Sequence, residues 1–190
     1  MHKYHRRLIE RLQYIRLRFH TSIVRLSPRI SVGNKTLISP GVVFKFEGSG
    51  RVSIGEHCRI DKGVILEARA GTIEIGNHVS INSYALLNGT CGVKIGNHCR
   101  IATQAVIVSG NHGVAPDELI RRQPVVGRGV AIGNDVWIAA NAVILDGAQI
   151  PDGCVIGAGA VVTPRPMISK GIYGGVPAKL IKSRDNRESE

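Results

Sequence analysis

Aromatic residues are scarce, at 4% of the 190 residues, and there is a single Trp. Proteins that bind single-stranded nucleic acid stack bases on aromatic side chains, so this scarcity argues against a nucleic-acid partner. The chain also lacks any run near the roughly 20 apolar residues that cross a bilayer, and it lacks the apolar stretch of a signal peptide. We therefore expect a cytoplasmic protein that does not bind nucleic acid.

No pair of cysteines has CxxC spacing. The four cysteines are Cys58, Cys91, Cys99 and Cys154, and their spacing predicts neither a zinc site nor a disulfide framework. What is abundant is Gly, with 23 residues, in a chain that is 43% hydrophobic. This composition predicts one turn-rich domain with a core of small and aliphatic side chains.

The chain has a net charge of +11. Acidic residues are nearly absent from its first 29 residues, which contain eight Lys and Arg and one acidic residue, Glu10. Apolar residues recur there at three- and four-residue steps, which predicts one amphipathic helix over residues 4–26, with a break near Thr21 as an option. The apolar positions are Leu8, Leu12, Ile15, Phe19, Ile23 and Leu26. Two interpretations stay open: contact with the inner face of a membrane, or packing of this stripe on the rest of the chain or on a neighbouring subunit.

A six-residue repeat fills most of the remaining sequence, with an aliphatic residue at its first place and a small residue at its fifth. Five consecutive units begin at Ile132, Ile138, Ile144, Ile150 and Ile156; earlier units begin at Val32, Ile54, Ile60, Ile75, Ile81, Ile95 and Ile101. Such a period suits a triangular coil with a short strand on each side and a turn at each corner. Stacked coils pair their strands in parallel and share one continuous core. All four cysteines fall at fifth places, so we interpret them as small core residues.

The repeat is interrupted over residues 109–128 by a long polar loop, and insertions of this kind are usually functional. The loop contains His112 between Asn111 and Gly113. An imidazole with a pKa near 6.5 is suited to take a proton from an attacking hydroxyl at neutral pH. His112 is therefore our candidate general base.

Three segments carry a family resemblance: Ile132-Gly-Asn-Asp-Val-Trp-Ile, Val155-Ile-Gly-Ala-Gly-Ala-Val-Val-Thr and Tyr173-Gly-Gly-Val-Pro-Ala-Lys. With the repeat and the loop, they make residues 30–184 resemble the maltose and galactoside O-acetyltransferases. The resemblance implies a left-handed parallel β-helix, a homotrimer with acyl-CoA sites between subunits, acetyl-CoA as co-substrate and no metal. The basic segment replaces the acidic helical cap of that group, which moves the expected acceptor towards polysaccharide or lipopolysaccharide precursors.

The same resemblance supplies candidate site residues. It implies that Asn82 contacts the acceptor or the oxyanion and that Trp137, with Asn111, lines the active-site groove. It further places Ala140 and Ala158 along the pantetheine arm of the co-substrate, and Thr163, Lys179 and Lys182 near its nucleotide. Pro164 and Arg165 follow Thr163 where the family often has Lys, so the phosphate contact is expected to shift. A structural turn role for Asn82 and a solubility role for the two lysines are the alternatives.

The predicted organisation is a basic helical segment at residues 1–29, a catalytic β-helix at residues 30–184 and a polar tail at residues 185–190. The predicted function is O-acetylation of a sugar or cell-surface glycan precursor from acetyl-CoA. N-acetylation of a nucleotide-linked amino sugar remains an alternative, as does a non-catalytic scaffold. A further alternative is a zinc enzyme like the γ-carbonic anhydrases, because His57, His78 and His98 share the fourth place of their repeat units.

Overall fold

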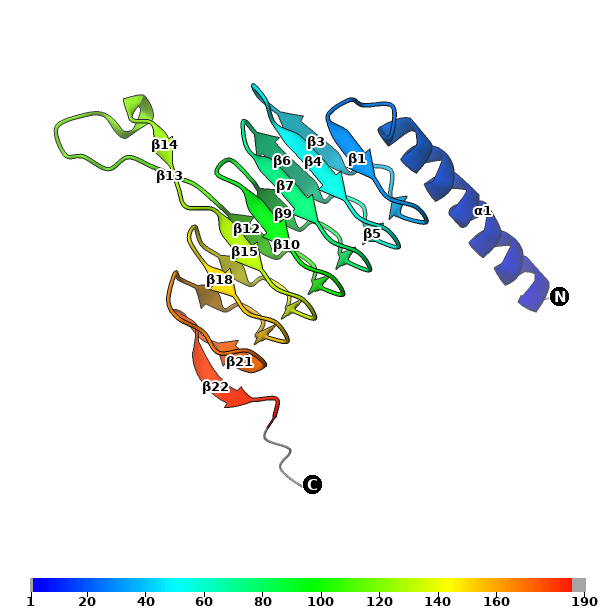
Figure 1. The fold of residues 1–190 in the computed structure, drawn as a ribbon. Helices are drawn as coiled ribbons and strands as arrows, with labels where there is room; N and C mark the ends of the chain where they lie inside the picture. The colour runs from blue at the N-terminus through cyan, green and yellow to red at the C-terminus, as the bar shows by residue number, and fades with distance from the viewer. Residues whose placement is uncertain (1, 186–190) are drawn as a thin grey trace.

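The computed structural model describes the backbone of residues 2–185 and the side chains of residues 11–185, and it consists of one helix followed by a parallel β-solenoid (Figure 1). Of the predicted polar tail, only residue 185 lies within the described part. The helix, α1, covers His2–Val24. Each coil of the solenoid contributes one strand to each of three sheets, which we name sheets A, B and C.

The strands follow the six-residue units. Sheet A contains β1 (Ile30–Val32), β4 (Arg51–Ile54), β7 (Thr72–Ile75), β10 (Val93–Ile95), β15 (Val130–Ile132) and β18 (Gln149–Ile150). Sheet B contains β2 (Leu37–Ile38), β5 (Arg59–Ile60), β8 (Ser80–Ile81), β11 (Arg100–Ile101), β16 (Trp137–Ile138), β19 (Val155–Ile156), β21 (Gly171–Gly174) and β22 (Lys179–Ser183). Sheet C contains β3 (Val43–Phe46), β6 (Ile65–Arg69), β9 (Leu86–Asn88), β12 (Val106–Val108), β17 (Val143–Ile144) and β20 (Val161–Val162).

The core is a set of aliphatic ladders, as the repeat predicts. Ile60, Ile81 and Ile101 stand directly opposite one another on successive strands of sheet B, and each is 0% exposed. Small residues at the fifth place, such as Cys58 and Cys99, fill the corners behind them and are also buried. Burial raises the pKa of the Cys99 thiol to about 11, so this thiol is neutral at physiological pH. The predicted role as core residues is confirmed for Cys58, Cys99 and Cys154, which are buried, whereas Cys91 is only partly buried.

The corner between sheets A and B is held by close backbone contact between coils. Gly96 lies so near the next coil that a Cβ added to it would be 2.6 Å from the Gly133 carbonyl oxygen. The side-chain oxygen of Asn97 accepts a hydrogen bond from the Asn77 N–H at 2.8 Å, and Asn134 does the same for the Asn97 N–H, also at 2.8 Å. Asparagine thus satisfies backbone groups that the turn leaves without a strand partner.

Helix α1 covers the open end of the first coil through one polar contact. The hydroxyl of Thr21, which is 2% exposed, accepts a hydrogen bond from the Ile38 N–H at 2.8 Å and donates one to the Leu17 carbonyl at 2.8 Å. The helix is continuous through Thr21, so the optional break there is wrong. Its apolar stripe does not pack on the coils: Leu12, Ile15, Phe19, Ile23 and Leu26 are all exposed. Among the described residues, no helix is long and apolar enough to cross a membrane.

We expect the substitution Gly96→Ala to destabilise the fold by about 3 kcal/mol, because its Cβ meets a backbone carbonyl that cannot rotate away. Gly48→Ala is the matched control. It also adds one methyl group to a turn, at φ +48°, but its nearest neighbour is 3.7 Å away, so it should cost only about 1 kcal/mol. Denaturant unfolding measures the free energy of unfolding of both variants. Equal losses of stability in the two variants would show that the close contact between coils at Gly96 does not limit the stability of the fold.

Candidate functional site

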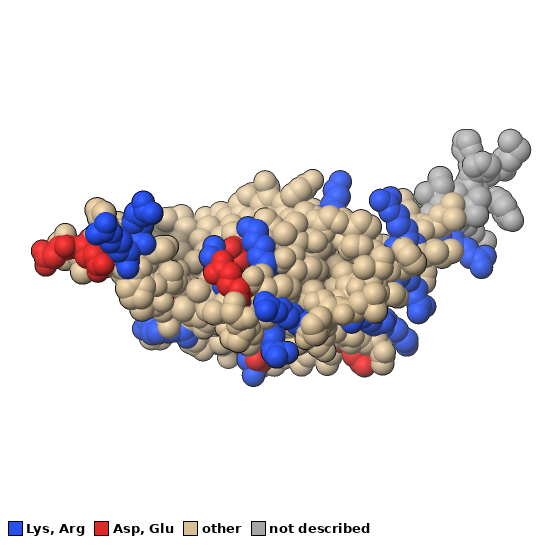
Figure 2. Space-filling model, turned by 90° about the horizontal axis from the view of Figure 1, so that it is seen from above, with Lys and Arg blue, Asp and Glu red and all other residues tan. Residues whose placement is uncertain are grey.

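The predicted loop is a hairpin at the corner between sheets C and A. Its strands β13 (Asn111–His112) and β14 (Val125–Val126) are antiparallel, and a short 3-10 turn, η1 (Ile120–Arg122), lies near its tip. The hairpin projects well away from the solenoid (Figure 1), and its charged tip is visible at the left of the view from above (Figure 2). His112 is exposed on it.

Gln123 holds the hairpin in shape from within. Its side chain is 7% exposed, its oxygen accepts a hydrogen bond from the Ala115 N–H at 2.8 Å, and its nitrogen donates to the carbonyls of Ala115 and Glu118 at 2.9 and 2.8 Å. A Cβ on Gly113 would meet this side chain at 2.6 Å. The loop that carries His112 is therefore an ordered element and not a loose insertion.

Asp146 ties the base of the hairpin to the solenoid. It is 9% exposed, and one of its oxygens accepts hydrogen bonds from the N–H groups of Arg128 and Gly129 at 2.8 and 2.9 Å. Its other oxygen accepts a hydrogen bond from the Asn111 side chain at 3.3 Å. Asn111, predicted in the groove, thus acts as an anchor beside His112. The sequence analysis identified neither Asp146 nor Gln123. The acidic side chain in the turn after Ile144 was a feature from which Asp146 could have been found.

The other predicted catalytic residue lies at a different corner. Asn82 is exposed in the turn after β8, between sheets B and C. Ala140 and Ala158 occupy the same corner in later coils, and small residues also fill its other late positions. Because sheet C separates this corner from the hairpin, one chain does not bring His112 and Asn82 together.

Trp137 lies on the outer face of sheet B in the same coil as Ala140. It is 50% exposed and stands in register between Arg100 and Val155. The indole therefore projects from the solenoid close to the corner that carries Asn82, where it is available to a ligand or to a second subunit.

The predicted nucleotide contacts partly share one hollow. Thr163, Arg165 and Lys179 line a depression of about 360 Å³ at the C-terminal end of the solenoid, together with Met167 and Leu180. Lys182 lies outside it, exposed on β22 opposite Ile172. Arg165 thus places a cation in the same hollow as Thr163, and the shift of the phosphate contact stays a prediction.

The outer face of sheet C carries an apolar ladder, with the polar row Lys45, Glu67 and Asn88 beside it in the first coils, whereas the outer face of sheet A is mainly polar. Sheet C presents the ladder Val43, Ile65, Leu86, Val106, Val143 and Val161, all partly or fully accessible. Sheet A presents Ser53, Glu74, Lys94, Ala131 and Gln149. The hairpin adds exposed Val114, Leu119 and Ile120, at 79%, 60% and 58%. Exposed apolar patches of this extent mark interaction surfaces.

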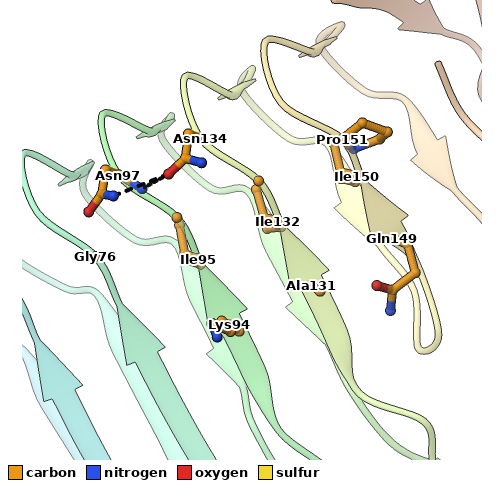
Figure 3. A pocket seen from close by; sticks show the side chains of 12 residues that line it. Gly76, Lys94, Ile95, Asn97, Ala131, Ile132, Asn134, Gln149, Ile150 and Pro151 are labelled. Carbon is orange, nitrogen blue, oxygen red and sulfur yellow. Dashed lines mark hydrogen bonds between the residues drawn. The ribbon is translucent and has the colours of Figure 1, made fainter. Parts of the chain in front are cut away.

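Two further hollows lie elsewhere on the solenoid. One, of about 540 Å³, follows the outer face of sheet A over Ala131, between Lys94 and Gln149 and beside the Asn97–Asn134 hydrogen bond (Figure 3). None of the predicted site residues lines it. The other, of about 550 Å³, lies between α1 and the first coils. It is lined by Gln13, Arg16, Leu17, Ser39, Pro40, Arg59, Asp61, Lys62 and Ser83, and the last of these follows Asn82 directly.

The three histidines of the metal-site alternative form a stack along the corner between sheets A and B. Ring centroids of His57 and His78 are 4.8 Å apart and those of His78 and His98 are 4.9 Å apart, with interplanar angles of 9° and 7°. Ring nitrogens bind metals in the plane of the ring, so stacked parallel rings do not converge on one ion. Within the described part of the chain, no group of three His, Cys, Asp or Glu side chains is arranged to hold a metal.

Comparison with known proteins shows similarity to transferases. Residues 126–164 match the family model described as bacterial transferase hexapeptide (six repeats). The bifunctional protein GlmU of Alkalilimnicola ehrlichii is 35% identical over 86 residues, which cover 40% of this chain and 18% of that protein. The chain thus spans less than a fifth of this relative.

Solved structures extend the likeness to most of the chain. AntD, an N-acyltransferase from Bacillus cereus solved as a variant with dTDP and coenzyme A, is 25% identical with a TM-score of 0.74, covering 86% of this chain and 88% of AntD. Another AntD variant, with dTDP-4-amino-4,6-dideoxyglucose and coenzyme A, is 28% identical with a TM-score of 0.67, covering 81% and 83%. A maltose O-acetyltransferase from Clostridium difficile, at 21% identity and a TM-score of 0.57 over 86% and 73%, shares the fold.

We expect Asp146→Ala to loosen the hairpin, because it removes the acceptor for two backbone N–H groups at the hairpin base, a loss of about 1 to 3 kcal/mol. Amide hydrogen exchange across residues 110–127 should accelerate while the ladders of sheets A to C stay protected. Asp146→Asn retains one acceptor oxygen and should behave almost as the wild type. Unchanged exchange in the alanine variant would show that Asp146 does not anchor the hairpin.

Proposed function

We propose that this chain is an acyltransferase of the hexapeptide-repeat class, and that it transfers an acetyl group from acetyl-CoA to a hydroxyl of a sugar in a polysaccharide or lipopolysaccharide precursor. The observation that carries this proposal is an ordered, anchored hairpin that projects one imidazole, His112, from an otherwise regular solenoid. The hairpin is held in place by buried polar side chains. A chemical role for its exposed histidine is the best explanation of this ordered support.

The proposed reaction needs one base and no covalent enzyme intermediate. Bound acetyl-CoA supplies the activated carbonyl. His112 takes the proton of the acceptor hydroxyl as its oxygen forms the new bond to that carbonyl carbon. The amide of Asn82 donates a hydrogen bond to the charge that develops on the carbonyl oxygen. When the carbon–sulfur bond breaks, the imidazolium of His112 returns the proton to the departing sulfur.

A homotrimer would complete this site. The apolar sheet C is bordered at one edge by the corner that carries Asn82 and at the other by the hairpin that carries His112. If three copies turn sheet C towards a common three-fold axis, the hairpin edge of each copy meets the Asn82 edge of the next. The exposed apolar side chains of the hairpin would then be covered by the neighbour. In this arrangement each site would lie between two subunits.

The corner between sheets B and C fits an extended thioester. Ala140 and Ala158 lie in neighbouring coils, which are spaced at about 4.8 Å, so an arm laid along this edge meets small side chains and exposed peptide groups. The hollow with Arg165 and Lys179 lies at the C-terminal end of the solenoid and offers cations to the nucleotide phosphates. The acyl end would then point back towards Asn82.

The hollow between α1 and the first coils supports a different kind of acceptor. It adjoins Asn82 through Ser83 and presents Arg16, Arg59 and Lys62, although Asp61 already binds Arg59 at 2.9 Å. Cations beside the acceptor position suit the diphosphate of a nucleotide-linked sugar. Together with the likeness to AntD, this supports N-acylation of a nucleotide-linked amino sugar as the alternative reaction.

We expect His112→Ala to lower kcat for acyl transfer about a hundredfold or more, because a positioned base contributes that much, while the melting temperature stays unchanged since the side chain is exposed. Mass spectrometry of the acylated acceptor measures the transfer. Treatment of the product with alkaline hydroxylamine separates the two acceptors, because it cleaves oxygen esters and leaves amides intact. Wild-type turnover by the alanine variant would exclude His112 as the base.

The subunit arrangement makes a separate prediction. The variants His112→Ala and Asn82→Ala should each be inactive alone. When subunits of the two variants are mixed one to one and reassembled, activity should return at about a quarter of the sites. These are the sites at which an intact hairpin of one subunit meets an intact Asn82 corner of the next. Size-exclusion chromatography confirms that the mixed protein is trimeric. If reassembled mixtures stay inactive while both variants remain trimeric, the two residues do not act across one interface.

A further inference from the structure

The apolar stripe of helix α1 has no partner among the residues that the structure describes. Its members are exposed to unusual degrees for large apolar side chains: Leu12 57%, Ile15 54%, Phe19 69%, Ile23 50% and, just beyond the helix, Leu26 82%. They follow one another at three- and four-residue steps, so they form one continuous line along the helix. This is a surface and not a set of scattered exposed residues.

The stripe points away from the solenoid. The residues of α1 that contact the first coil are Leu17, Thr21 and Val24, which also follow one another at three- and four-residue steps. Phe19 and Thr21 are two residues apart, which is roughly 200° around the helix axis. The packed face and the apolar stripe therefore lie on nearly opposite sides of α1, and no movement of side chains could bury the stripe against the chain's own coils.

The flanks of the stripe are strongly basic. Residues 11–29 contain no Asp or Glu, and their Arg residues are Arg11, Arg16, Arg18, Arg25 and Arg29, all of them exposed. Two copies that paired through this stripe would bring these like charges together, with Glu10 as the one acidic residue of each helix to set against them. An anionic surface, in contrast, complements both the charge and the apolar line.

We infer that this face of α1 lies in the interface of an anionic lipid bilayer, with the apolar stripe inserted among the acyl chains and the arginines on the lipid phosphates. The mean orientation follows from the packing: Thr21 faces the solenoid, so the solenoid stands on the side of the helix opposite the lipid. The helix lies at the N-terminal end of the solenoid (Figure 1). The protein would therefore rest on the membrane by that end, with its later coils pointing away from the surface.

Sedimentation of the full chain with vesicles tests this inference. The wild type should bind vesicles of phosphatidylcholine with about 30% phosphatidylglycerol and should not bind vesicles of phosphatidylcholine alone, and raised salt should weaken the binding. Phe19→Glu should weaken it roughly tenfold, because it places a charge in the centre of the stripe. Gln13→Glu is the matched control: it changes the net charge of the same helix equally at an exposed position off the stripe, and it should weaken binding less than about twofold.

Circular dichroism checks that both variants keep the fold, which is expected because Gln13 and Phe19 are exposed. Three outcomes would overturn the inference. The wild type binds neither kind of vesicle, or it binds both equally, or Phe19→Glu binds as well as Gln13→Glu. A fourth would reassign the stripe: if Phe19→Glu alone lowers the mass of the assembly in sedimentation without lipid, the stripe is a contact between subunits and not a membrane surface. The readouts are independent of acyl transfer, so failure here leaves the proposed activity untouched.

Discussion

The close approach of successive coils at the corner between sheets A and B is the constraint on which the rest of the structure depends. At Gly96 there is no space for a Cβ, and Asn77, Asn97 and Asn134 each accept a hydrogen bond from a backbone N–H of the preceding coil. Because glycines at the same place in five successive coils, from Gly33 to Gly133, lie similarly close to the next coil, these contacts fix the spacing and the register of the three sheets together. The aliphatic ladders can stack without gaps only because this corner is held so tightly.

Most of the fold follows from the sequence because its period is short and repeated. A residue such as Ile101 is inward by its place in the unit, and every neighbouring unit confirms the assignment, so the three sheets and the buried cysteines were predictable. The direction in which the apolar stripe of α1 faces was not predictable. Periodicity shows that a helix has an apolar side but does not show what covers it. The hydrogen bond that orients α1, which the Ile38 N–H donates to the Thr21 hydroxyl, joins residues with no shared pattern.

The loop and its histidine could be identified from the sequence as a candidate site, but the residues that support them could not. The loop and His112 stand out because they interrupt a regular repeat, whereas Asp146 and Gln123 act through hydrogen bonds to backbone groups that no motif identifies. The roles of Asn82 and the co-substrate residues rest on resemblance. In one chain, sheet C separates His112 from Asn82. The two edges of this sheet can meet only when copies of the chain assemble.

The position of the hairpin follows from where the solenoid tolerates a change in length. From Ile54 to Ile60 and from Ile60 to Leu66 the spacing is one unit, and every later coil keeps both spacings across the first two corners. The third corner, between sheets C and A, absorbs all the variation, from the short turn after Leu145 to the whole excursion of residues 109–128. An insertion at the first corner would break the backbone contacts there. A functional element can be added to this solenoid only at the corner that does not hold the coils together, and that corner borders the apolar sheet, so the hairpin is placed to reach a neighbouring copy.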